Sequence, residues 1–269
     1  LIAYNINLNT RDQRLAMDIA FELREKGRSK RILNPESPNL LDGEIVRDEK
    51  GKAVKIPGLF KDIKGVGWYM DEFKRAQISI NFNNYKVSTI HDVFDKACEL
   101  GVERGVRVTG SELVGLIPRE ALLMAGRHYL KMQRRTTAVP EADLIECAVQ
   151  SLGLNDLYPF KPEEKIVEFA VGQSSGQLMD LTSEGFMDEL SSNSPAPGGG
   201  SVAALAGSLG AALVSMVAAL THEKKGFETS KDEMEILGNK AQKIKNRLSF
   251  LVDEDTNAFN AVMEVNRLP

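Results

Sequence analysis

A loop rich in proline and glycine, followed by a long uncharged run, restricts the fold of this chain more than any other stretch. Residues 194–201 read Ser-Pro-Ala-Pro-Gly-Gly-Gly-Ser, and residues 202–221 contain no charged side chain. The two prolines fix their φ angles and prevent a helix before the loop. The three glycines allow the backbone to turn freely and to approach another molecule closely. We therefore predict a loop followed by a tightly packed helix from Val202 to about Thr221.

The N-terminus of this helix is a candidate ligand site. Ser201 can cap the helix, and a helix that starts behind glycines offers unpaired N–H groups and the positive end of its dipole. A phosphate, a carboxylate or the polar edge of a ring would fit Gly198, Gly199, Gly200 and Ser201. The loop also fits a flexible linker, and the uncharged run is long enough for a transmembrane span. Because small residues dominate the run and no second span or aromatic belt accompanies it, we favour a bundle helix and no membrane.

The composition is that of an ordinary globular protein. The 269 residues suffice for two domains, and the formal net charge of −4 gives no indication of a nucleic-acid partner. Cys98 and Cys147 match no metal spacing and no disulfide framework, so we predict a reducing compartment, the cytoplasm. The chain opens on a strand pattern without an initiator methionine or a signal peptide. We expect it to be a piece of a longer chain.

Residues 1–110 follow an order of strand and helix patterns that defines a fold. Strand patterns at 1–8, 64–70, 75–83 and 105–110 enclose helix patterns at 10–26 and 89–100. The order β-α-β-β-α-β is that of the ferredoxin-like unit, whose first and third strands are central neighbours. We therefore predict an α+β protein in which a ferredoxin-like subdomain precedes an all-α, bundle-type domain.

One face of the predicted sheet carries an unusual number of amides. If the apolar face packs against the two helices, Asn5, Asn7, Ser79 and Asn81 stand together on the uncovered face. Asparagine is a poor strand former, so its repetition there needs a reason. The face is either simply solvated, or it binds a heterocycle or a second layer of protein.

Three more helix patterns, at 118–132, 141–152 and 163–170, complete a first domain of residues 1–172. The sequence Gly-Gln-Ser-Ser-Gly at 172–176 predicts a linker, which we place at 173–180, and the second domain spans 181–269. His91 and His128 lie on predicted helices without a partner at ligand spacing. We predict structural roles for both histidines and no metal site.

The second domain ends in a long helix pattern from Ser230 to about Asn266. Its apolar residues recur at steps of three and four, as in the seam of a bundle: Met234, Leu237, Ala241, Ile244, Leu248, Leu251, Ala258, Val262 and Val265. The stripe omits one position, which holds Asp255. Burying an unpaired carboxylate costs on the order of several kcal/mol, so Asp255 must be paired, protonated or functional. We predict that it is a general acid or base, whereas Asp253 and Glu254 lie off the stripe in solvent.

Five motifs, in this order, carry a resemblance to a known family. They are Ala-Tyr-Asn-Ile-Asn-Leu at 3–8, Gly-Val-Gly-Trp-Tyr at 65–69, Gly-Ser-Glu-Leu-Val-Gly-Leu-Ile-Pro at 110–118, Pro-Gly-Gly-Gly-Ser at 197–201 and Leu-Val-Asp-Glu-Asp at 251–255. The chain resembles formimidoyltransferase-cyclodeaminase over essentially its whole length. Residues 1 to about 172 resemble the C-terminal subdomain of the transferase half. Residues from about 178 resemble the start of the helical cyclodeaminase half.

The resemblance implies a bifunctional folate enzyme of histidine degradation, a transferase and lyase. The first half would transfer a formimino group from N-formimino-L-glutamate to tetrahydrofolate, the co-substrate, which we expect to be polyglutamylated. The second would cyclise the product to 5,10-methenyltetrahydrofolate and release ammonia. Asp255 resembles the catalytic aspartate of the cyclodeaminase, and residues 198–201 its folate-binding loop. Asn5, Asn7 and Asn81 would face the transferase folate site, Arg28 would hold glutamate carboxylates, and the helical domain would form a homo-oligomer.

Two departures from the family pattern lead to a further expectation. None of His91, His128 and His222 matches the transferase histidine that the resemblance implies in an N-terminal subdomain, and the helical half ends at Pro269. We therefore expect the isolated chain to catalyse neither reaction well. A non-catalytic module that binds folate or an anion and serves assembly stays open as an alternative. Nucleotide binding by the glycines is disfavoured, because no Lys-Ser/Thr pair follows them.

Overall fold

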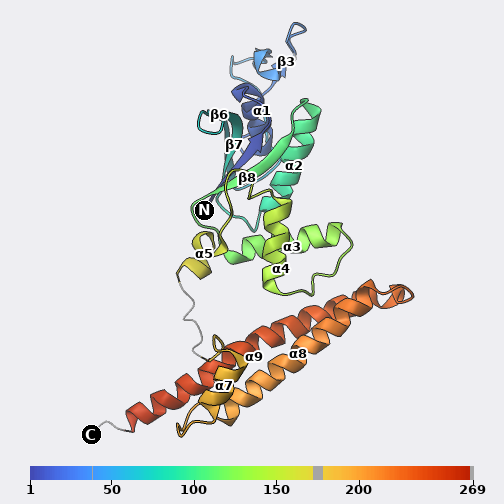
Figure 1. The fold of residues 1–269 in the computed structure, drawn as a ribbon. Helices are drawn as coiled ribbons and strands as arrows, with labels where there is room; N and C mark the ends of the chain where they lie inside the picture. Colours follow the sequence, from blue (N-terminus) through green and yellow to red (C-terminus); the bar gives the residue numbers. More distant parts are fainter. Residues whose placement is uncertain (38, 172–177, 267–269) are drawn as a thin grey trace. The chain divides into compact units, whose positions relative to one another are not determined.

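The computed structural model describes residues 1–37, 39–171 and 178–266, and it has the predicted α+β composition (Figure 1). The chain forms two compact units. The first contains Leu1–Tyr129 and Leu144–Val171, and the second contains Leu130–Asp143 and the chain from Gly172 onward. The predicted linker at 173–180 falls mostly outside the described residues.

The first unit is built on a four-stranded antiparallel sheet. Its strands are β1 (Ile2–Leu8), β6 (Ile63–Met70), β7 (Arg75–Phe82) and β8 (Val108–Val114), in the order β6-β7-β1-β8. The first and third strands of the motif, β1 and β7, are therefore central neighbours, and Asn5 lies opposite Ser79. The prediction of a ferredoxin-like unit is confirmed.

Helices α1 (Gln13–Leu23) and α2 (Ile90–Glu103) cover the apolar face of this sheet. Strand residues at alternate positions supply the core, because successive side chains of a strand point to opposite faces. Each fully buried aliphatic side chain contributes about 1.5–3 kcal/mol. The largest fully buried side chains include Tyr4, Ile6, Ile19, Leu23, Ile78, Ile80, Phe82 and Leu100. In the Gly-Val-Gly motif of β6, a Cβ at Gly67 would overlap the backbone of Met17 on α1, so glycine permits this close approach.

Several predicted boundaries shift for identifiable reasons. Helix α1 begins at Gln13 rather than at residue 10, because the carboxylate of Asp12 caps it by accepting the N–H of Arg14. Helix α2 runs past the predicted end at residue 100 to Glu103, and Gly105, which has a positive φ, follows it. The last strand spans Val108–Val114 rather than 105–110, so it ends four residues later than predicted.

The segment between α1 and β6 contains short strands that pair in twos. Strand β2 (Arg28–Ser29) pairs with β5 (Lys55–Ile56), and β3 (Arg31–Ile32) pairs with β4 (Glu44–Ile45). One 3-10 turn, η1 (Leu40–Asp42), lies between β3 and β4. The trailing helices are α3 (Arg119–Met132), α4 (Glu141–Ser151), α5 (Pro162–Lys165) and α6 (Val167–Ala170).

The second unit is organised around a helical hairpin. Helices α8 (Gly199–Glu223) and α9 (Lys231–Val265) lie side by side in Figure 1, with η2 (Glu228–Ser230) between them and α7 (Ser183–Leu190) before them. The buried residues of α8 repeat every seven positions as serine and alanine: Ser201, Ala204, Ser208, Ala211, Ser215 and Ala218. Ser201 and Ser208 donate their hydroxyls to the carbonyls of Val252 and Lys245 on α9. The small side chains allow close approach, and the hydroxyls fix the register of the two helices.

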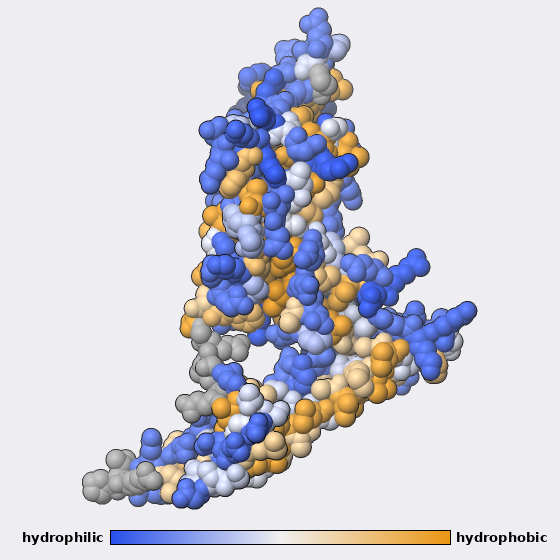
Figure 2. Space-filling model, viewed as in Figure 1, coloured by the Kyte–Doolittle hydropathy of each residue, from blue (hydrophilic) through white to orange (hydrophobic). Residues whose placement is uncertain are grey.

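The predicted stripe on α9 is only partly the packing seam. Gly238, Ala241 and Val252 are buried, whereas Leu237, Ile244, Val262 and Val265 are exposed. The reason is the small seam of α8, which selects small partners and leaves the larger apolar residues on the flanks. Large apolar side chains of α8 are exposed as well, namely Leu209, Leu213, Met216, Val217 and Leu220. Figure 2 accordingly shows much hydrophobic surface, drawn in orange, on the hairpin.

Helix α8 is, within the described residues, the one helix long and apolar enough to cross a membrane by length and composition. Only 22% of its most apolar window is buried inside the unit. A single helix of this kind is weak support for a membrane span, because core helices of soluble proteins pass the same test.

A connecting segment between α3 and α4 belongs to the second unit. Thr136 and Thr137 donate hydroxyl hydrogen bonds to the carboxylate of Glu235 on α9, the first at 2.5 Å, and the N–H of Thr137 adds a third. Burial alone would raise the pKa of Glu235, but the hydrogen bonds from Thr136 and Thr137 outweigh it and lower the pKa. This carboxylate anchors the segment to α9.

Candidate functional site

The first turn of α8 is the best-defined candidate site of the second unit. Gly198 is the N-cap residue, and Gly199 and Gly200 already belong to the helix. The prediction that the helix starts at Val202 was therefore short by one turn, and Ser201 is not the cap. The N–H groups of Gly199 and Gly200 make no hydrogen bond within the described residues. They remain available to a ligand, as the first N–H groups of a helix are.

Asp255 on α9 reaches this first turn. Its Oδ2 accepts the backbone N–H of Ser201 at 3.0 Å and lies 3.3 Å from the hydroxyl oxygen of Ser201, whereas its Oδ1 takes part in no hydrogen bond within the described residues. A side chain at position 200 would collide with this carboxyl group, because a Cβ there would lie 2.5 Å from Oδ2 of Asp255. Glycine at 200 therefore makes room for the aspartate.

One expectation about Asp255 is wrong. The stripe on α9 placed the carboxylate toward the core, but the residue is exposed. The physical reason is that Ser201 and Val252 occupy the buried seam, while Asp255 lies beside it and bonds to a helix end. Asp253 is also not simply solvated, because it accepts the N–H of Leu178 at 2.7 Å. Glu254 is exposed, as predicted.

An open cavity of about 550 Å³ lies at this point of the hairpin. It is lined by Gly200, Ala203, Ala204, Leu248, Leu251, Glu254, Asp255 and Ala258. The cavity thus combines an apolar floor with two carboxylates and the N-terminus of α8. Such a mixture suits a flat, partly polar molecule.

The polar face of the sheet is the candidate site of the first unit, and the fold places the predicted amides on it. Asn5 and Asn7 are buried, while Ser79 is half-buried and Asn81 is exposed. Asn5 donates to Glu112 at 3.1 Å, and Asn7 donates to Asp156 at 3.0 Å. Asn5 and Asn7 are therefore held in a network, whereas Asn81 is open to a ligand.

Sequence reasoning missed the carboxylates and partners of this network. The amide of Gln77 donates to the side-chain oxygen of Asn7. The indole of Trp68 donates to Gln77, and the hydroxyl of Tyr158 donates to Glu112. Burial, followed by the hydrogen bond to Glu112, raises the pKa of Tyr158. Glu112 could have been found by continuing the alternation of β8 beyond Gly110, which puts residues 110, 112 and 114 on the face of Asn5. Tyr158 follows the sheet and has no comparable signal.

The structure argues against Arg28 as a binder of ligand carboxylates. Its side chain is only 8% exposed, and its guanidinium is paired with Asp18 and lies 3.6 Å from Glu22. Arg104 binds the same two carboxylates, at 2.5 Å each. Asp18 and Glu22 of α1 thus form one ion network with Arg28 and Arg104. We assign Arg28 a structural role in this network.

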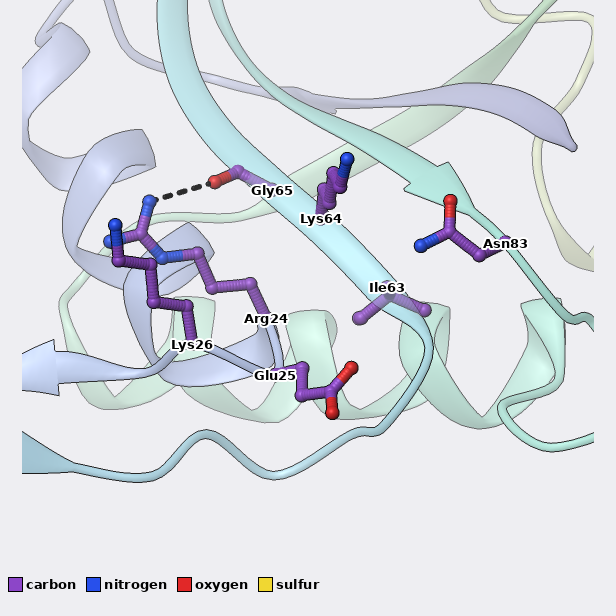
Figure 3. A pocket seen from close by; sticks show the side chains of 7 residues that line it. All are labelled: Arg24, Glu25, Lys26, Ile63, Lys64, Gly65 and Asn83. Atoms are coloured by element: carbon purple, nitrogen blue, oxygen red, sulfur yellow. Dashed lines mark hydrogen bonds between the residues drawn. The ribbon is translucent and has the colours of Figure 1, made fainter.

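A different set of basic residues lines a cavity at the edge strand β6. This cavity, of about 510 Å³, is lined by Arg24, Glu25, Lys26, Ile63, Lys64, Gly65 and Asn83 (Figure 3). The guanidinium of Arg24 donates to the carbonyls of Gly65 and Gly27, and burial lowers the pKa of Arg24. Figure 3 shows Arg24 and Lys26 close together at one end of the cavity, and Lys64 lies opposite Asn81 in the sheet. The basic lining favours an anionic ligand.

Together, fold and sites define a two-part α+β protein in which a ferredoxin-like unit with a polar sheet face accompanies a helical hairpin with a carboxylate at a helix N-terminus. The formiminotransferase domain model matches residues 3–172, and the formiminotransferase-cyclodeaminase model matches residues 182–269. The chain belongs to the formimidoyltransferase-cyclodeaminase family.

Individual relatives agree with this assignment. The chain is 38% identical over 272 residues to formimidoyltransferase-cyclodeaminase of Mus musculus, and the match covers 100% of this chain and 45% of the relative. It is 41% identical over 88 residues to methenyltetrahydrofolate cyclohydrolase of Methylorubrum extorquens, which covers 33% of this chain and 42% of that protein. It is 26% identical over 132 residues, 49% of this chain and 34% of the relative, to glutamate formimidoyltransferase of Thermoplasma acidophilum. The chain spans about half the length of the bifunctional relatives.

Proposed function

We propose that this chain supplies part of a bifunctional folate enzyme that transfers the formimino group of N-formimino-L-glutamate to tetrahydrofolate and then closes the product to 5,10-methenyltetrahydrofolate. The observation that carries the second reaction is the Asp255 carboxylate bound to the first turn of α8 at an open cavity. Similarity to a formimidoyltransferase-cyclodeaminase over the whole chain, and to a glutamate formimidoyltransferase over about half of it, supports this proposal.

Ring closure needs one proton to leave a nitrogen and another nitrogen to gain protons. In the proposed reaction N10 of the folate attacks the formimino carbon, the N10–carbon bond forms, and N10 loses its proton. As N10 attacks, the C=N π bond opens onto the imino nitrogen, which takes up the proton from N10 and a second proton from solvent. The carbon–nitrogen bond then breaks, ammonia leaves, and the lone pair of N5 forms the new C=N bond of the methenyl product. Asp255 is the group that relays the proton, with its free Oδ1 directed to the reaction and its Oδ2 held by Ser201. The N–H groups of Gly199 and Gly200 bind an electron-rich edge of the pterin.

The transferase substrates belong to the polar face of the sheet in this proposal. Asn81 and Ser79 contact the ligand, and Asn5 and Asn7 support them through Glu112 and its partners. The basic cavity lined by Arg24, Lys26 and Lys64, rather than Arg28, receives the glutamate carboxylates of a polyglutamylated folate. Lys64 belongs to both regions, because it lines the basic cavity and lies opposite Asn81 of the polar sheet face.

An Asp255→Asn substitution in the full-length protein tests the ring-closure step. We expect loss of methenyl-folate formation and of ammonia release, with unchanged formimino transfer, circular dichroism and oligomer size. Asp232→Asn on the same helix is the matched control, because Asp232 is exposed in the first turn of α9. If the variant keeps its cyclisation rate, the proposal is wrong. If it loses assembly instead, the non-catalytic module is the better description.

A second candidate reaction has a specific observation in its favour. A match of 41% identity to a methenyltetrahydrofolate cyclohydrolase covers 88 residues, a third of this chain. The same carboxylate could activate water for attack on the methenyl carbon, which opens the ring instead of closing it. Supplying methenyltetrahydrofolate and following its hydrolysis distinguishes the two. Hydrolysis faster than ammonia-releasing closure would favour the cyclohydrolase.

We further propose a cytoplasmic homo-oligomer without a membrane or nucleic-acid partner. The exposed apolar side chains of α8 support a protein neighbour, and the free thiols of Cys98 and Cys147 support a reducing compartment. A Leu213→Glu variant of the full-length protein should then dissociate on size exclusion. Flotation of the unmodified protein with lipid vesicles would instead favour a membrane role for α8.

A further inference from the structure

Two histidines that are distant in sequence meet in the first unit, outside both sites described above. His91 lies in the first turn of α2 and His128 lies on α3. Their rings are stacked, with centroids 4.3 Å apart and an interplanar angle of 28°. The pairing of two imidazoles from two helices is a product of tertiary structure, and no spacing in the sequence indicates it.

His91 is the unusual member of the pair. His91 is only 7% exposed, and its Nδ1 is buried without a hydrogen-bond partner in the described residues. Its Nε2 lies 4.0 Å from Oδ1 of Asp92, which is too far for a hydrogen bond. A buried ring nitrogen without a hydrogen-bond partner is unfavourable, which makes His91 a candidate for an unfilled binding role.

The surroundings of His128 resemble those of a metal-bound imidazole. Its Nε2 lies 2.9 Å from Oδ2 of Asp95, whose other oxygen accepts the hydroxyl of Tyr129 at 2.9 Å. A carboxylate that accepts the proton of one ring nitrogen fixes the tautomer and orientation of the ring, and it leaves the other nitrogen free to coordinate. Tyr129 in turn fixes Asp95.

We propose that His91, Asp92 and His128 form a zinc-binding site between α2 and α3. Each offers one ligand atom, and the three atoms lie within 4.8 Å of one another. Tetrahedral zinc has bonds of about 2.0–2.1 Å to nitrogen and oxygen, which puts its ligand atoms about 3.3 Å apart, so the ligand atoms must close by at most about 1.5 Å. Asp92, whose side chain is 53% exposed, and His128, at 28%, have the freedom to do so and give the ion an entry path. Two imidazoles and one carboxylate favour zinc over magnesium or calcium.

The test is a zinc titration of the full-length protein after removal of metal with a chelator. We expect one equivalent of Zn²⁺ per chain by calorimetry, and Co²⁺ in its place should give the absorption of a low-symmetry site. His128→Gln should weaken binding at least about tenfold, and Asp95→Asn, a positioning change, about 10–100-fold. His222→Gln is the matched control, because the sequence contains three histidines and His222 lies in the other unit.

The outcomes separate cleanly. Absence of stoichiometric zinc binding, undiminished binding by His128→Gln, or loss of binding in His222→Gln would each overturn the proposal. Binding that disappears when Cys98 and Cys147 are alkylated would also overturn it, since neither thiol is among the three ligands. Circular dichroism must show that each variant is folded. Should His128→Gln fail to fold, Asp92→Asn removes the third ligand at an exposed position and must weaken zinc binding.

Discussion

Substitution of Gly200 by alanine is the sharpest probe of the contact between α8 and Asp255. The added Cβ would lie 2.5 Å from Oδ2 of Asp255 and closer still to Oδ1, so the carboxylate must leave the first turn. The lost hydrogen bond to Ser201 resembles the loss of a helix cap, which costs about 1 kcal/mol, and water can partly replace it because Asp255 is exposed. Alanine regains up to about 0.8–1.0 kcal/mol of helix propensity.

The two terms nearly cancel, so the free energy of unfolding should change by less than about 1 kcal/mol in a urea titration. The rate of methenyl-folate formation by the full-length protein should nevertheless fall about 100-fold or more, because a displaced general acid or base is lost to the reaction. Gly210→Ala is the matched control. A Cβ there meets nothing within 4 Å, so we expect stabilisation by about 1 kcal/mol and an unchanged rate. A folded Gly200→Ala variant with the normal rate would refute the assigned role of Asp255.

Three further perturbations test the rest of the structure. Asn7→Ala removes partners from Gln77 and Asp156 inside the sheet network and should destabilise the first unit by about 1–3 kcal/mol in urea; no change would mean that water replaces them. Arg28→Met leaves Asp18 with Arg104 alone and should cost about 3 kcal/mol without changing the affinity for folate, whereas weaker folate binding would restore Arg28 as a ligand residue. For Glu235, the folded pKa lies below its ordinary value of 4.5, so its stabilising contribution is present above that pH and is lost as the pH falls through the folded pKa. Glu235→Gln should flatten the acid limb of unfolding against pH, and Glu233→Gln on the same helix should not.

The sheet and its polar face were predictable because their signals are local. Alternation in β1 and β7 fixes which residues share a face, and the order of elements then fixes which strands are neighbours. The face assignment of Asn5, Asn7, Ser79 and Asn81 therefore needed no tertiary information. The misplaced end of β8 hid Glu112, since a strand that stops at residue 110 cannot show its outward carboxylate.

The environments of Asp255 and Arg28 were not predictable, because each depends on a partner chosen in three dimensions. The long helix α9 has two overlapping stripes, one of small and one of larger apolar residues, and the small seam of α8 selects between them. Periodicity alone favoured the larger residues and put Asp255 inside. Arg28 is paired with Asp18 from α1 and shares that carboxylate with Arg104, which comes from beyond α2. No spacing in the sequence predicts that Arg28, Asp18 and Arg104 form one ion network.

The passage of residues 130–143 into the second unit has a practical consequence for anyone who divides this protein. Family boundaries suggest a cut between residues 172 and 182, yet such a cut would leave Thr136 and Thr137 on one piece and their acceptor, Glu235, on the other. One piece would then carry the hydroxyls of Thr136 and Thr137 without their acceptor, and the other would carry the Glu235 carboxylate without its donors. A division of the chain must therefore keep residues 130–143 with the second unit, or replace the interactions that they provide.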